Sequence, residues 1–524
     1  MKQEWLESAI LYEVYPPSFQ DSNSDGIGDL EGICARLEHI KELGCDGIWM
    51  NPCYESLFMD GGYDISNHRK VAERYGTNDM MKKLLDRAHE LGLKVILDVV
   101  PGHTALNHPW FLKSLEAEEN EFYGRYIWSD NIWEDFHGIK NIKGFLRGIG
   151  KRNAACAINC YSTQPALNYG FAKPDKPWQD SVDSPNARAT RQALFDIMKF
   201  WMDMGCDGFR VDMAGSLVKN DIDDSANIKF WQELGAEIRE YKKDVVLFSE
   251  WGVPDKALQA GFELDFLHVL GECRFDMLFR TEKPYFSGED GADGADIFVR
   301  TYQNYMNYTT PDNSICVVTG CHDIPRLAWR LDQEQLKLAF VFLMTIPGVP
   351  MIYYGDEIGM RYLEDIPSVE GAYERTGARS PMQWGDGPNC GFSNGSPETL
   401  YIPLDDDVNR PDVAKQSKDP DSLLNFVKKL NEIKHQTAAF HAHAGWKVIS
   451  EGKSGEPLVY QRMWEDSCVS VLIWPGKEEK IISGFEKGGE VLLQTGKVES
   501  DEAGNYVMGP CSCAIIRNMD KMEG

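Results

Sequence analysis

The chain has 524 residues, enough for about three domains of ordinary size or for one large α/β barrel with a small additional domain. Its 43% hydrophobic and 26% charged residues are typical of a globular protein and exclude a collagen, a coiled coil or a disordered chain. The 54 basic and 82 acidic residues give a net charge of −28, which would repel nucleic-acid phosphates and anionic lipids.

Membrane, secretory and disulfide signals are weak throughout the sequence. No apolar run approaches the ~18 residues of a membrane-spanning helix, and the opening residues MKQEW have none of the character of a secretory signal. The thirteen cysteines are odd in number and scattered, which favours a reducing compartment. We therefore expect a cytoplasmic protein that binds neither nucleic acid nor membrane, of an oligomeric state that the sequence does not indicate.

The first hundred residues alternate short apolar runs with amphipathic stretches, the pattern of βαβ units. We predict strands at residues 10–15, 46–50 and 95–100, with helices at 33–43 and 80–91 between them. Residues 104–180 lose this rhythm and become rich in Asn, Gly, Trp and Tyr. Because long insertions on one face of a barrel usually carry function, this segment is predicted to be an inserted domain.

The alternation then resumes and continues to about residue 441. Further strands are predicted at 208–212, 245–250, 266–270, 315–319 and 351–354, and further helices at 187–204, 228–241, 297–306, 335–345 and 423–434. The last stretch has short strands and turns, such as 458–460 and 470–474. The predicted fold is an α/β protein: a (β/α)8 TIM barrel formed by residues 1–103 and 181–441, with an inserted domain at 104–180 and a β-sandwich-like domain at 442–524.

Polar residues follow several of the predicted barrel strands, at the end where barrel enzymes carry their chemistry. They are Asp98 and His103, Arg210 and Asp212, Glu250, His322 and Asp323, with Tyr63 and Asp64 in the loop after the second strand. Any one of them could be a helix cap or a surface acid. Three carboxylates at one ring of strand ends instead predict a catalytic pocket.

Cleavage of an acetal needs one carboxylic acid for the leaving oxygen and one carboxylate on the opposite face of the sugar. Asp212 and Glu250, on adjacent strands, suit such a pair. Asp323 would raise the proton affinity of the acid and stabilise a developing cation, and Arg210 would orient Asp212. His103 and His322 offer donors to sugar hydroxyls, and Tyr63 offers a ring face on which a sugar can stack.

Four short motifs, at residues 98–103 (DVVPGH), 208–212 (GFRVD), 249–252 (SEWG) and 321–323 (CHD), resemble those of glycoside hydrolase family 13, the α-amylase family, in order and spacing. The resemblance runs from Tyr12 into the C-terminal β region. It implies that Asp212 is the nucleophile, Glu250 the general acid/base and Asp323 the transition-state stabiliser, with retention of configuration. The insertion and the terminal β region would then correspond to the family's domains B and C.

Within that family the chain looks most similar to the oligo-1,6-glucosidase and α-glucosidase branch, through residues 61–66 (GGYDIS), 164–168 (QPALN) and 378–384 (ARSPMQW). The resemblance implies that Asp64 and Arg379 pair and close the pocket beyond one glucose unit, and Phe145 is a candidate wall of that pocket. It implies a retaining, exo-acting α-glucosidase of short maltose- or isomaltose-type α-glucosides. The alternatives are a transglycosylase or isomerase of the trehalose-synthase kind, or a non-catalytic glycan-binding relative.

The loop at residues 21–29 (DSNSDGIGD) places oxygen ligands at alternate positions with a glycine at the sixth, as in the first part of an EF-hand loop. Its candidate ligands are Asp21, Asn23, Asp25, the carbonyl of Ile27, and Asp29. These hard oxygen donors suit a structural Ca²⁺, with Mg²⁺ as the alternative, and the resemblance implies the same. A turn rich in Asx residues that binds no ion is the competing interpretation.

Overall fold

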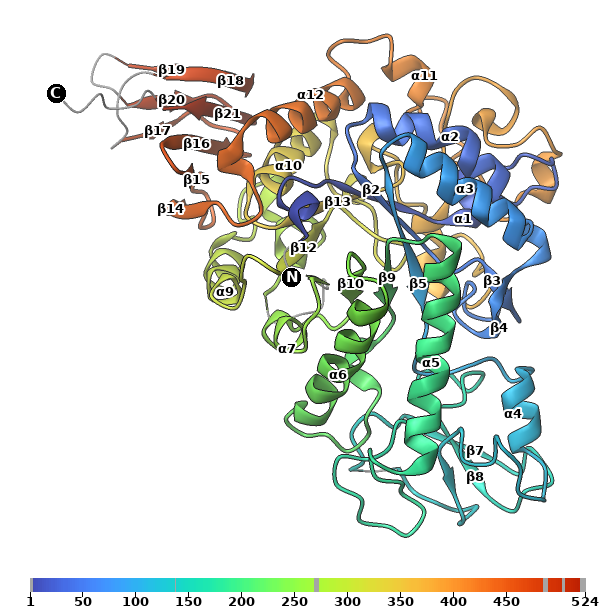
Figure 1. Cartoon of the computed structure of the whole chain (residues 1–524). Helices are drawn as coiled ribbons and strands as arrows, with labels where there is room; N and C mark the ends of the chain where they lie inside the picture. The colour runs from blue at the N-terminus through green and yellow to red at the C-terminus, as the bar shows by residue number, and fades with distance from the viewer. Residues whose placement is uncertain (1–2, 137, 268–272, 484–488, 502–504, 519–524) are drawn as a thin grey trace.

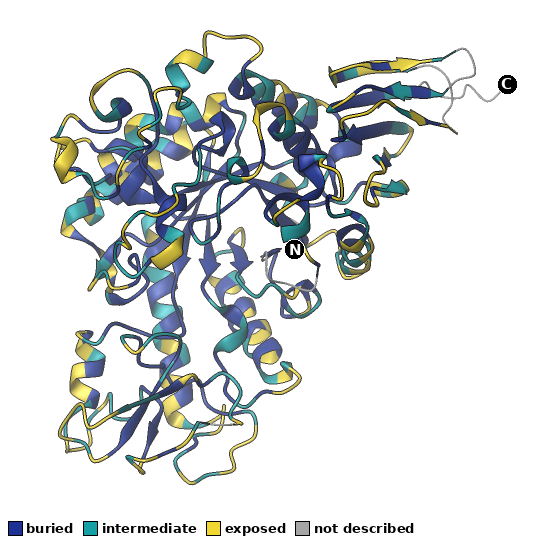
Figure 2. Ribbon diagram, turned by 180° about the vertical axis from the view of Figure 1, so that it is seen from behind, coloured by how far each residue is buried: buried dark blue, intermediate teal, exposed yellow. Residues whose placement is uncertain are grey.

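The structure is a computed structural model of the chain, and it describes residues 3–136, 138–267, 273–483, 489–501 and 505–518. Figure 1 shows three parts: a central barrel wrapped by helices, an extended lobe that carries β7 and β8, and a set of sheets that ends the chain. In Figure 2 the buried residues concentrate in the barrel strands and on the inner faces of the surrounding helices. No helix in the described part of the chain is long and apolar enough to cross a membrane.

Within the described residues, parallel strands close into an eight-stranded barrel in the order β1, β13, β12, β11, β10, β9, β5, β2. Their bounds are β1 Leu11–Val14, β2 Gly47–Met50, β5 Lys94–Val99, β9 Gly208–Val211, β10 Val246–Ser249, β11 Leu264–Phe266, β12 Ser314–Val318 and β13 Val349–Tyr353. Nearly every residue of these strands is buried, as expected for a parallel sheet covered on both faces. The predicted (β/α)8 barrel is confirmed. The strand predicted at 266–270 begins earlier, at Leu264, and its residues 268–270 lie outside the described residues.

Amphipathic helices form the outer layer of the barrel. The longer ones are α2 Leu30–Glu42, α3 Asn78–Glu90, α5 Pro185–Met204, α6 Ser225–Tyr241, α9 Asp296–Met306, α10 Gln333–Thr345 and α12 Leu423–Gln436. Shorter ones are α1 Pro16–Phe19, α4 Pro109–Ser114, α7 Pro254–Gln259, α8 Asp276–Phe279 and α11 Val413–Gln416. Helix α3 shows the pattern: Met81, Leu84, Leu85 and Ala88 form its buried stripe, and the Thr77 side chain caps its N-terminus.

Small sheets lie in the loops that follow β2 and β5. After β2, β3 Tyr54–Ser56 pairs with β4 Ile65–Val71. After β5, β6 Trp128–Ser129, β7 Gly144–Arg147 and β8 Ala155–Ile158 form a three-stranded sheet with its own apolar cluster, which includes Ile127, Ala166 and Phe171. These last strands lie inside the predicted insertion, whose boundaries at 104 and 180 stay a prediction.

The chain ends in antiparallel sheets, which confirms the predicted C-terminal all-β region. One has the order β14, β15, β16, β21, β18, and the other the order β17, β20, β19. Their bounds are β14 Gly445–Glu451, β15 Leu458–Trp464, β16 Ser467–Trp474, β17 Lys480–Ile482, β18 Glu490–Thr495, β19 Val498–Ser500, β20 Tyr506–Met508 and β21 Ser512–Arg517. Buried Arg462 donates hydrogen bonds to the carbonyl groups of Thr345 in α10 and of His441, so β15 is joined directly to the barrel.

Candidate active site

A single buried arginine gathers three carboxylates at the ends of three adjacent strands. In Arg210, which belongs to β9, the Nη1 atom lies 3.1 Å from Oδ1 of Asp98 and 3.2 Å from Oδ1 of Asp212. Its Nη2 atom lies 2.6 Å from Oε2 of Glu250. The barrel order explains this arrangement: Asp98 in β5 is the register partner of Arg210, and β10, which precedes Glu250, pairs with the other edge of β9. Strand ends far apart in sequence therefore converge on one guanidinium.

Asp212 and Glu250 share this arginine and influence each other's charge. Burial, and then repulsion from the Glu250 carboxylate, raise the pKa of Asp212 well above its usual range, against the opposing effect of Arg210. Two carboxyl groups whose charges interact in this way titrate as a pair, so the raised pKa belongs to the pair rather than to Asp212 alone. A pair that retains one proton at neutral pH supplies one acid and one carboxylate, as glycosidic cleavage requires.

Asp323 lies among cations and a neutral imidazole. Nη1 of Arg375 is 2.8 Å and Nη2 of Arg379 is 3.0 Å from its Oδ1, and Nε2 of His322 is 3.3 Å from its Oδ2. Burial alone would raise the pKa of Asp323, but His322, Arg375 and Arg379 outweigh it and hold that pKa well below its usual range. Asp323 is therefore a fixed negative charge in the site.

The ion pair predicted between Asp64 and Arg379 is wrong in this structure. Asp64 is turned toward Ser56 and the backbone N–H groups of Met59 and Asp60, which donate to its carboxylate. Arg379 donates to Asp323 and to the carbonyl of His322. A different pair spans the pocket: Nη2 of Arg375 lies 3.0 Å from Oδ1 of Asp60. Asp60 and Arg375 each lie four residues before the residue that was predicted. The prediction therefore identified the correct loops but the wrong side chains.

Two predicted substrate contacts, Tyr63 and His103, have specific surroundings. Tyr63 faces the pocket, donates its hydroxyl to Asp98 at 3.0 Å and stacks on the His322 ring at 5.3 Å. His103 also lines the pocket, but its Nε2 is 3.1 Å from the carbonyl oxygen of Tyr63 and its Nδ1 3.1 Å from the Asn159 amide nitrogen. Burial lowers the pKa of His103 to about 4, so the neutral ring donates to Tyr63 and accepts from Asn159.

The pocket itself is a cavity of about 230 Å³, below the ~300–1,000 Å³ of pockets for drug-sized ligands. It is lined by Asp60, Tyr63, His103, Cys160, Tyr161, Gln164, Asp212, Met213, Glu250, Asp323 and Arg375. Phe145, predicted as a wall, is not among them: it packs on Trp178 in the apolar cluster of the insertion. Sequence reasoning missed Asp60, Tyr161 and Arg375, although each lies within a few residues of a motif that had been noticed.

The loop at 21–29 is folded by its own side chains. Asp21, Asn23 and Asp25 each accept a hydrogen bond from the backbone N–H two residues later. The Asp29 carboxylate caps α2 through the N–H of Gly32 and also accepts from Ser22. Among the residues described, no group of three or more His, Cys, Asp or Glu side chains is placed to hold a metal ion. The oxygen donors remain chemically suited to Ca²⁺, and its binding stays a prediction.

Comparison with known proteins agrees with this geometry. The family model for the alpha amylase catalytic domain matches residues 13–443. The chain belongs to the alpha-amylase family. Membership, together with the carboxylates gathered at the strand ends, makes the protein a glycoside hydrolase.

Relatives in this family carry several names. A probable oligo-1,6-glucosidase 2 from Bacillus subtilis is 31% identical over 84% of this chain and 85% of its own length. A trehalose synthase/amylase from Mycolicibacterium smegmatis is 30% identical over 83% of this chain and 77% of its own. The crystal structure of the trehalulose synthase MutB from Pseudomonas mesoacidophila has the same fold, with a TM-score of 0.81 at 23% identity over 98% of this chain and 99% of that one.

Proposed function

We propose that this alpha-amylase family protein is a retaining, exo-acting α-glucosidase that hydrolyses short α-glucosides of the maltose or isomaltose type. The names of its oligo-1,6-glucosidase relatives support this substrate class. In the proposed reaction Asp212 is the nucleophile, Glu250 the general acid/base and Asp323 the stabiliser of the transition state.

The proposal that the enzyme is exo-acting rests on the bridge formed by Arg375. Its guanidinium donates to Asp323 at 2.8 Å and to Asp60 at 3.0 Å, and all three residues line the small catalytic pocket. A side chain held at both ends by carboxylates forms a fixed wall. A wall at this place limits the pocket to one terminal sugar, which is the requirement for release of single glucose units.

The first half of the reaction forms a covalent bond. Asp212 attacks the anomeric carbon from one face while Glu250 gives its proton to the leaving oxygen, and the leaving sugar departs. The positive charge that develops on the glucose ring faces Asp323, whose carboxylate stays ionised. In the second half Glu250 takes a proton from water, the water oxygen attacks the same carbon, and Asp212 leaves, so the configuration is retained.

In the proposed mechanism Arg210 acts in both half-reactions through its contact with Glu250. Because its Nη2 is 2.6 Å from Oε2 of Glu250, it stabilises the carboxylate that Glu250 becomes after it has donated its proton. The backbone N–H of Met213 donates to the same oxygen at 3.0 Å. Both contacts hold the acid/base in place through the two half-reactions.

A second candidate is a transglycosylase or isomerase, in which a sugar rather than water attacks the covalent intermediate. The 30% identity to a trehalose synthase/amylase supports it. The glycan-binding alternative is disfavoured because a binding protein has no use for three catalytic carboxylates.

Product analysis by NMR distinguishes these functions. The protein is incubated separately with maltose, isomaltose, sucrose and trehalose. Release of glucose first seen as the α-anomer supports the retaining hydrolase and identifies its linkage. Release of β-glucose contradicts retention, and a new disaccharide without net glucose supports the isomerase.

We further propose that the loop with Asp21, Asn23, Asp25, Ile27 and Asp29 binds a structural Ca²⁺ or Mg²⁺. The supporting feature is the chemistry of its hard oxygen donors. Its position after β1, in the turn that starts α2, favours a stabilising ion over a catalytic one.

A further inference from the structure

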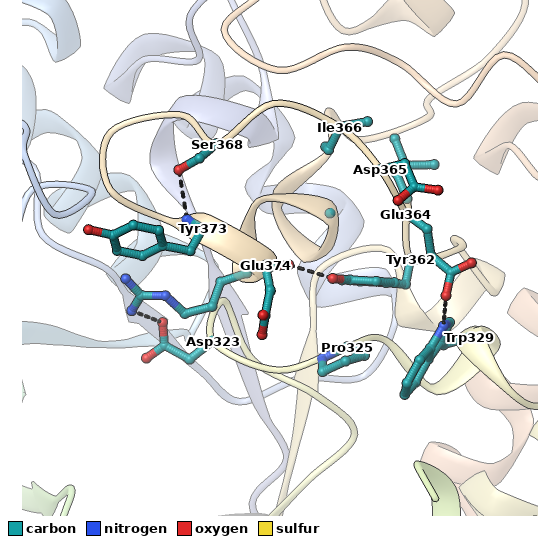
Figure 3. Close-up of a pocket in the computed structure, with 13 residues that line it drawn as sticks. Asp323, Pro325, Trp329, Tyr362, Glu364, Asp365, Ile366, Ser368, Tyr373 and Glu374 are labelled. Carbon is teal, nitrogen blue, oxygen red and sulfur yellow. Dashed lines mark hydrogen bonds and ion pairs between the residues drawn. The ribbon is translucent and has the colours of Figure 1, made fainter. Parts of the chain in front are cut away.

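Arg379 stands behind Asp323, and each nitrogen of its guanidinium has a partner. Nη2 donates to Oδ1 of Asp323 at 3.0 Å, Nε donates to the carbonyl of His322 at 2.8 Å, and Nη1 donates to the hydroxyl of Tyr15 at 3.2 Å. Figure 3 shows Asp323 below Tyr373, the first residue of the short 3-10 helix that ends at Arg379. The reaction proposed above assigns no role to Tyr15.

The Tyr15 hydroxyl begins a row of hydrogen bonds among residues that do not line the catalytic pocket. It lies 3.2 Å from the hydroxyl of Tyr401, which donates to Oε2 of Glu370 at 2.9 Å. Glu370 is in turn held by Arg74, whose two Nη atoms donate to its two carboxylate oxygens. Two tyrosine hydroxyls therefore connect the guanidinium behind Asp323 to an ion pair in other loops. We call Tyr15 and Tyr401 the tyrosine bridge.

The direction of each hydrogen bond in this row follows from its two ends. An arginine nitrogen can only donate, and the Glu370 carboxylate, paired with Arg74, can only accept. Because Tyr401 gives its single proton to Glu370, the bond between the two hydroxyls takes its proton from Tyr15. Tyr15 therefore accepts from Arg379 and donates to Tyr401. Hydrogen bonds that run in one direction polarise and strengthen one another.

The contact between Arg379 and Tyr15 is buried and closely packed. Each of the two residues is 1% exposed. A Cβ atom added at Gly61 would lie 2.7 Å from Nη1 of Arg379 and 3.2 Å from the Tyr15 hydroxyl oxygen, so the backbone of the loop after β2 closes over the contact. Burial also raises the pKa of Tyr401 well above its usual range, so its hydroxyl keeps its proton. Without the Tyr15 hydroxyl, Nη1 would lose its acceptor in a place that water does not reach.

The tyrosine bridge joins segments that are far apart in sequence. Tyr15 directly follows β1, Tyr401 precedes α11, and Glu370 belongs to the long loop after β13. Backbone hydrogen bonds hold the outer end: the N–H of Tyr401 donates to the carbonyl of Gly26 at 2.9 Å, and the N–H of Gly61 donates to the carbonyl of Glu370 at 3.1 Å. The outer end of the bridge is therefore anchored to the scaffold.

We propose that Tyr15 and Tyr401 are positioning residues that hold Arg379, and through it the carboxylate of Asp323, where the positive charge of the transition state develops. The proposal rests on the function proposed above, since it takes Asp323 as the stabiliser of that charge. A fixed carboxylate stabilises a cationic transition state more than it stabilises a neutral substrate. Loss of the bridge should therefore lower kcat and change KM little.

The test uses the hydroxyl deletions Tyr15→Phe and Tyr401→Phe with two competitive inhibitors. Deoxynojirimycin has the shape of glucose with a protonated ring nitrogen, so it resembles the cationic transition state, whereas glucose is neutral. In Tyr15→Phe, kcat for p-nitrophenyl α-glucopyranoside should fall about tenfold, and Ki for deoxynojirimycin should rise by about the same factor. KM and the Ki for glucose should stay within about twofold. A general disturbance of the fold would weaken both inhibitors alike.

The order of the hydrogen bonds predicts how the two variants combine. Tyr401→Phe keeps the contact between Tyr15 and Arg379 and removes only the acceptor behind it, so its effect on kcat should be smaller, about threefold. In the double variant, kcat should be no lower than in Tyr15→Phe alone, because Tyr401 acts through Tyr15. Losses that multiply would show that the two tyrosines act independently and would overturn the bridge. If Tyr15→Phe does not fold, Tyr401→Phe carries the inhibitor test with the smaller expected change.

Tyr302→Phe is the matched control. Tyr302 is buried in α9, and its hydroxyl donates to the carbonyl of Pro347 at 2.7 Å, away from the catalytic pocket. This variant should lose stability in thermal unfolding but keep the ratio of the two inhibition constants. An unchanged ratio in Tyr15→Phe and Tyr401→Phe would overturn the positioning role, while hydrolysis of the p-nitrophenyl glucoside by the unaltered chain upholds the α-glucosidase. Failure of the unaltered chain to cleave every α-glucoside would overturn both.

Discussion

Oε1 of Glu13 lies 2.8 Å from Nδ1 of His322, inside the barrel and out of contact with solvent. Burial raises the pKa of Glu13 well above its usual range and lowers that of His322 to about 3, so burial favours the neutral form of both groups. The second carboxyl oxygen of Glu13 has no hydrogen-bond partner among the described residues. A protonated Glu13 donates to Nδ1, which leaves Nε2–H of His322 to donate to Asp323.

This relationship predicts different outcomes for two substitutions at residue 13. Glu13→Gln keeps an N–H donor to Nδ1 and should leave kcat within about twofold, whereas in Glu13→Ala only the Asn51 amide, 3.1 Å from Nδ1, remains as a donor and kcat should fall about 10- to 100-fold. Steady-state kinetics with thermal unfolding as the folding check measures this. Equal losses in both variants would mean that the charge of Glu13, not its donor, is needed.

The two carboxyl groups held by Arg210 are expected to be essential. Asp212→Asn removes the nucleophile and should abolish turnover, and Glu250→Gln removes proton transfer, which is worth about 10²- to 10⁴-fold in kcat. Both variants should keep their melting temperature within a few degrees. Near-normal kcat in either one would refute the assignment.

Arg375→Ala should open the catalytic pocket. The substitution removes the wall between Asp60 and Asp323, so products longer than glucose should appear from a maltohexaose or isomaltohexaose digest. Chromatography of the products measures this, and Arg300→Ala, at an exposed ion pair with Glu451, is the control. A product pattern of glucose alone in Arg375→Ala would contradict the closure.

Acid should destabilise the protein through its buried histidines. Burial lowers the pKa of His108 from 6.5 to about 4, so the unfolded chain binds the proton more tightly. The stability that this neutral histidine contributes is fully present above pH 6.5 and is lost as the pH falls toward 4, by at most about 3 kcal/mol.

His108→Asn removes the titration but keeps an acceptor at the N-terminus of α4, where the His108 side chain accepts from Trp110. The variant should lose less stability between pH 6.5 and 4.5 than the unaltered chain, as followed by thermal unfolding. If stability falls with pH by the same amount in both proteins, protonation of His108 does not cause the loss of stability.

Calcium should stabilise the fold more than it affects catalysis. An ion that binds only the folded loop raises the free energy of unfolding by mass action, so millimolar Ca²⁺ after treatment with EDTA should raise the Tm while kcat changes little. Asp25→Ala, which removes one proposed ligand and one loop hydrogen bond, should abolish the rise. Loss of kcat on chelation without a change in Tm would point to a catalytic ion instead.

The barrel and its carboxylates could be predicted from the sequence because the signals are local. Each strand is a short apolar run, each helix has a buried stripe, and the residues after the strands of a closed barrel must meet at one end. Asp98, Asp212 and Glu250 illustrate this, since the pairing of β5, β9 and β10 alone brings them to Arg210.

The tertiary structure decided which loop residues face one another. Asp60 and Arg375 are 315 positions apart and belong to long loops after β2 and β13, where no periodicity relates a side chain to its neighbours. In the same loops the family resemblance implied Asp64 and Arg379, chemically equal choices four residues away. The path of a loop depends on packing against segments distant in sequence, and the sequence pattern carries no record of that packing.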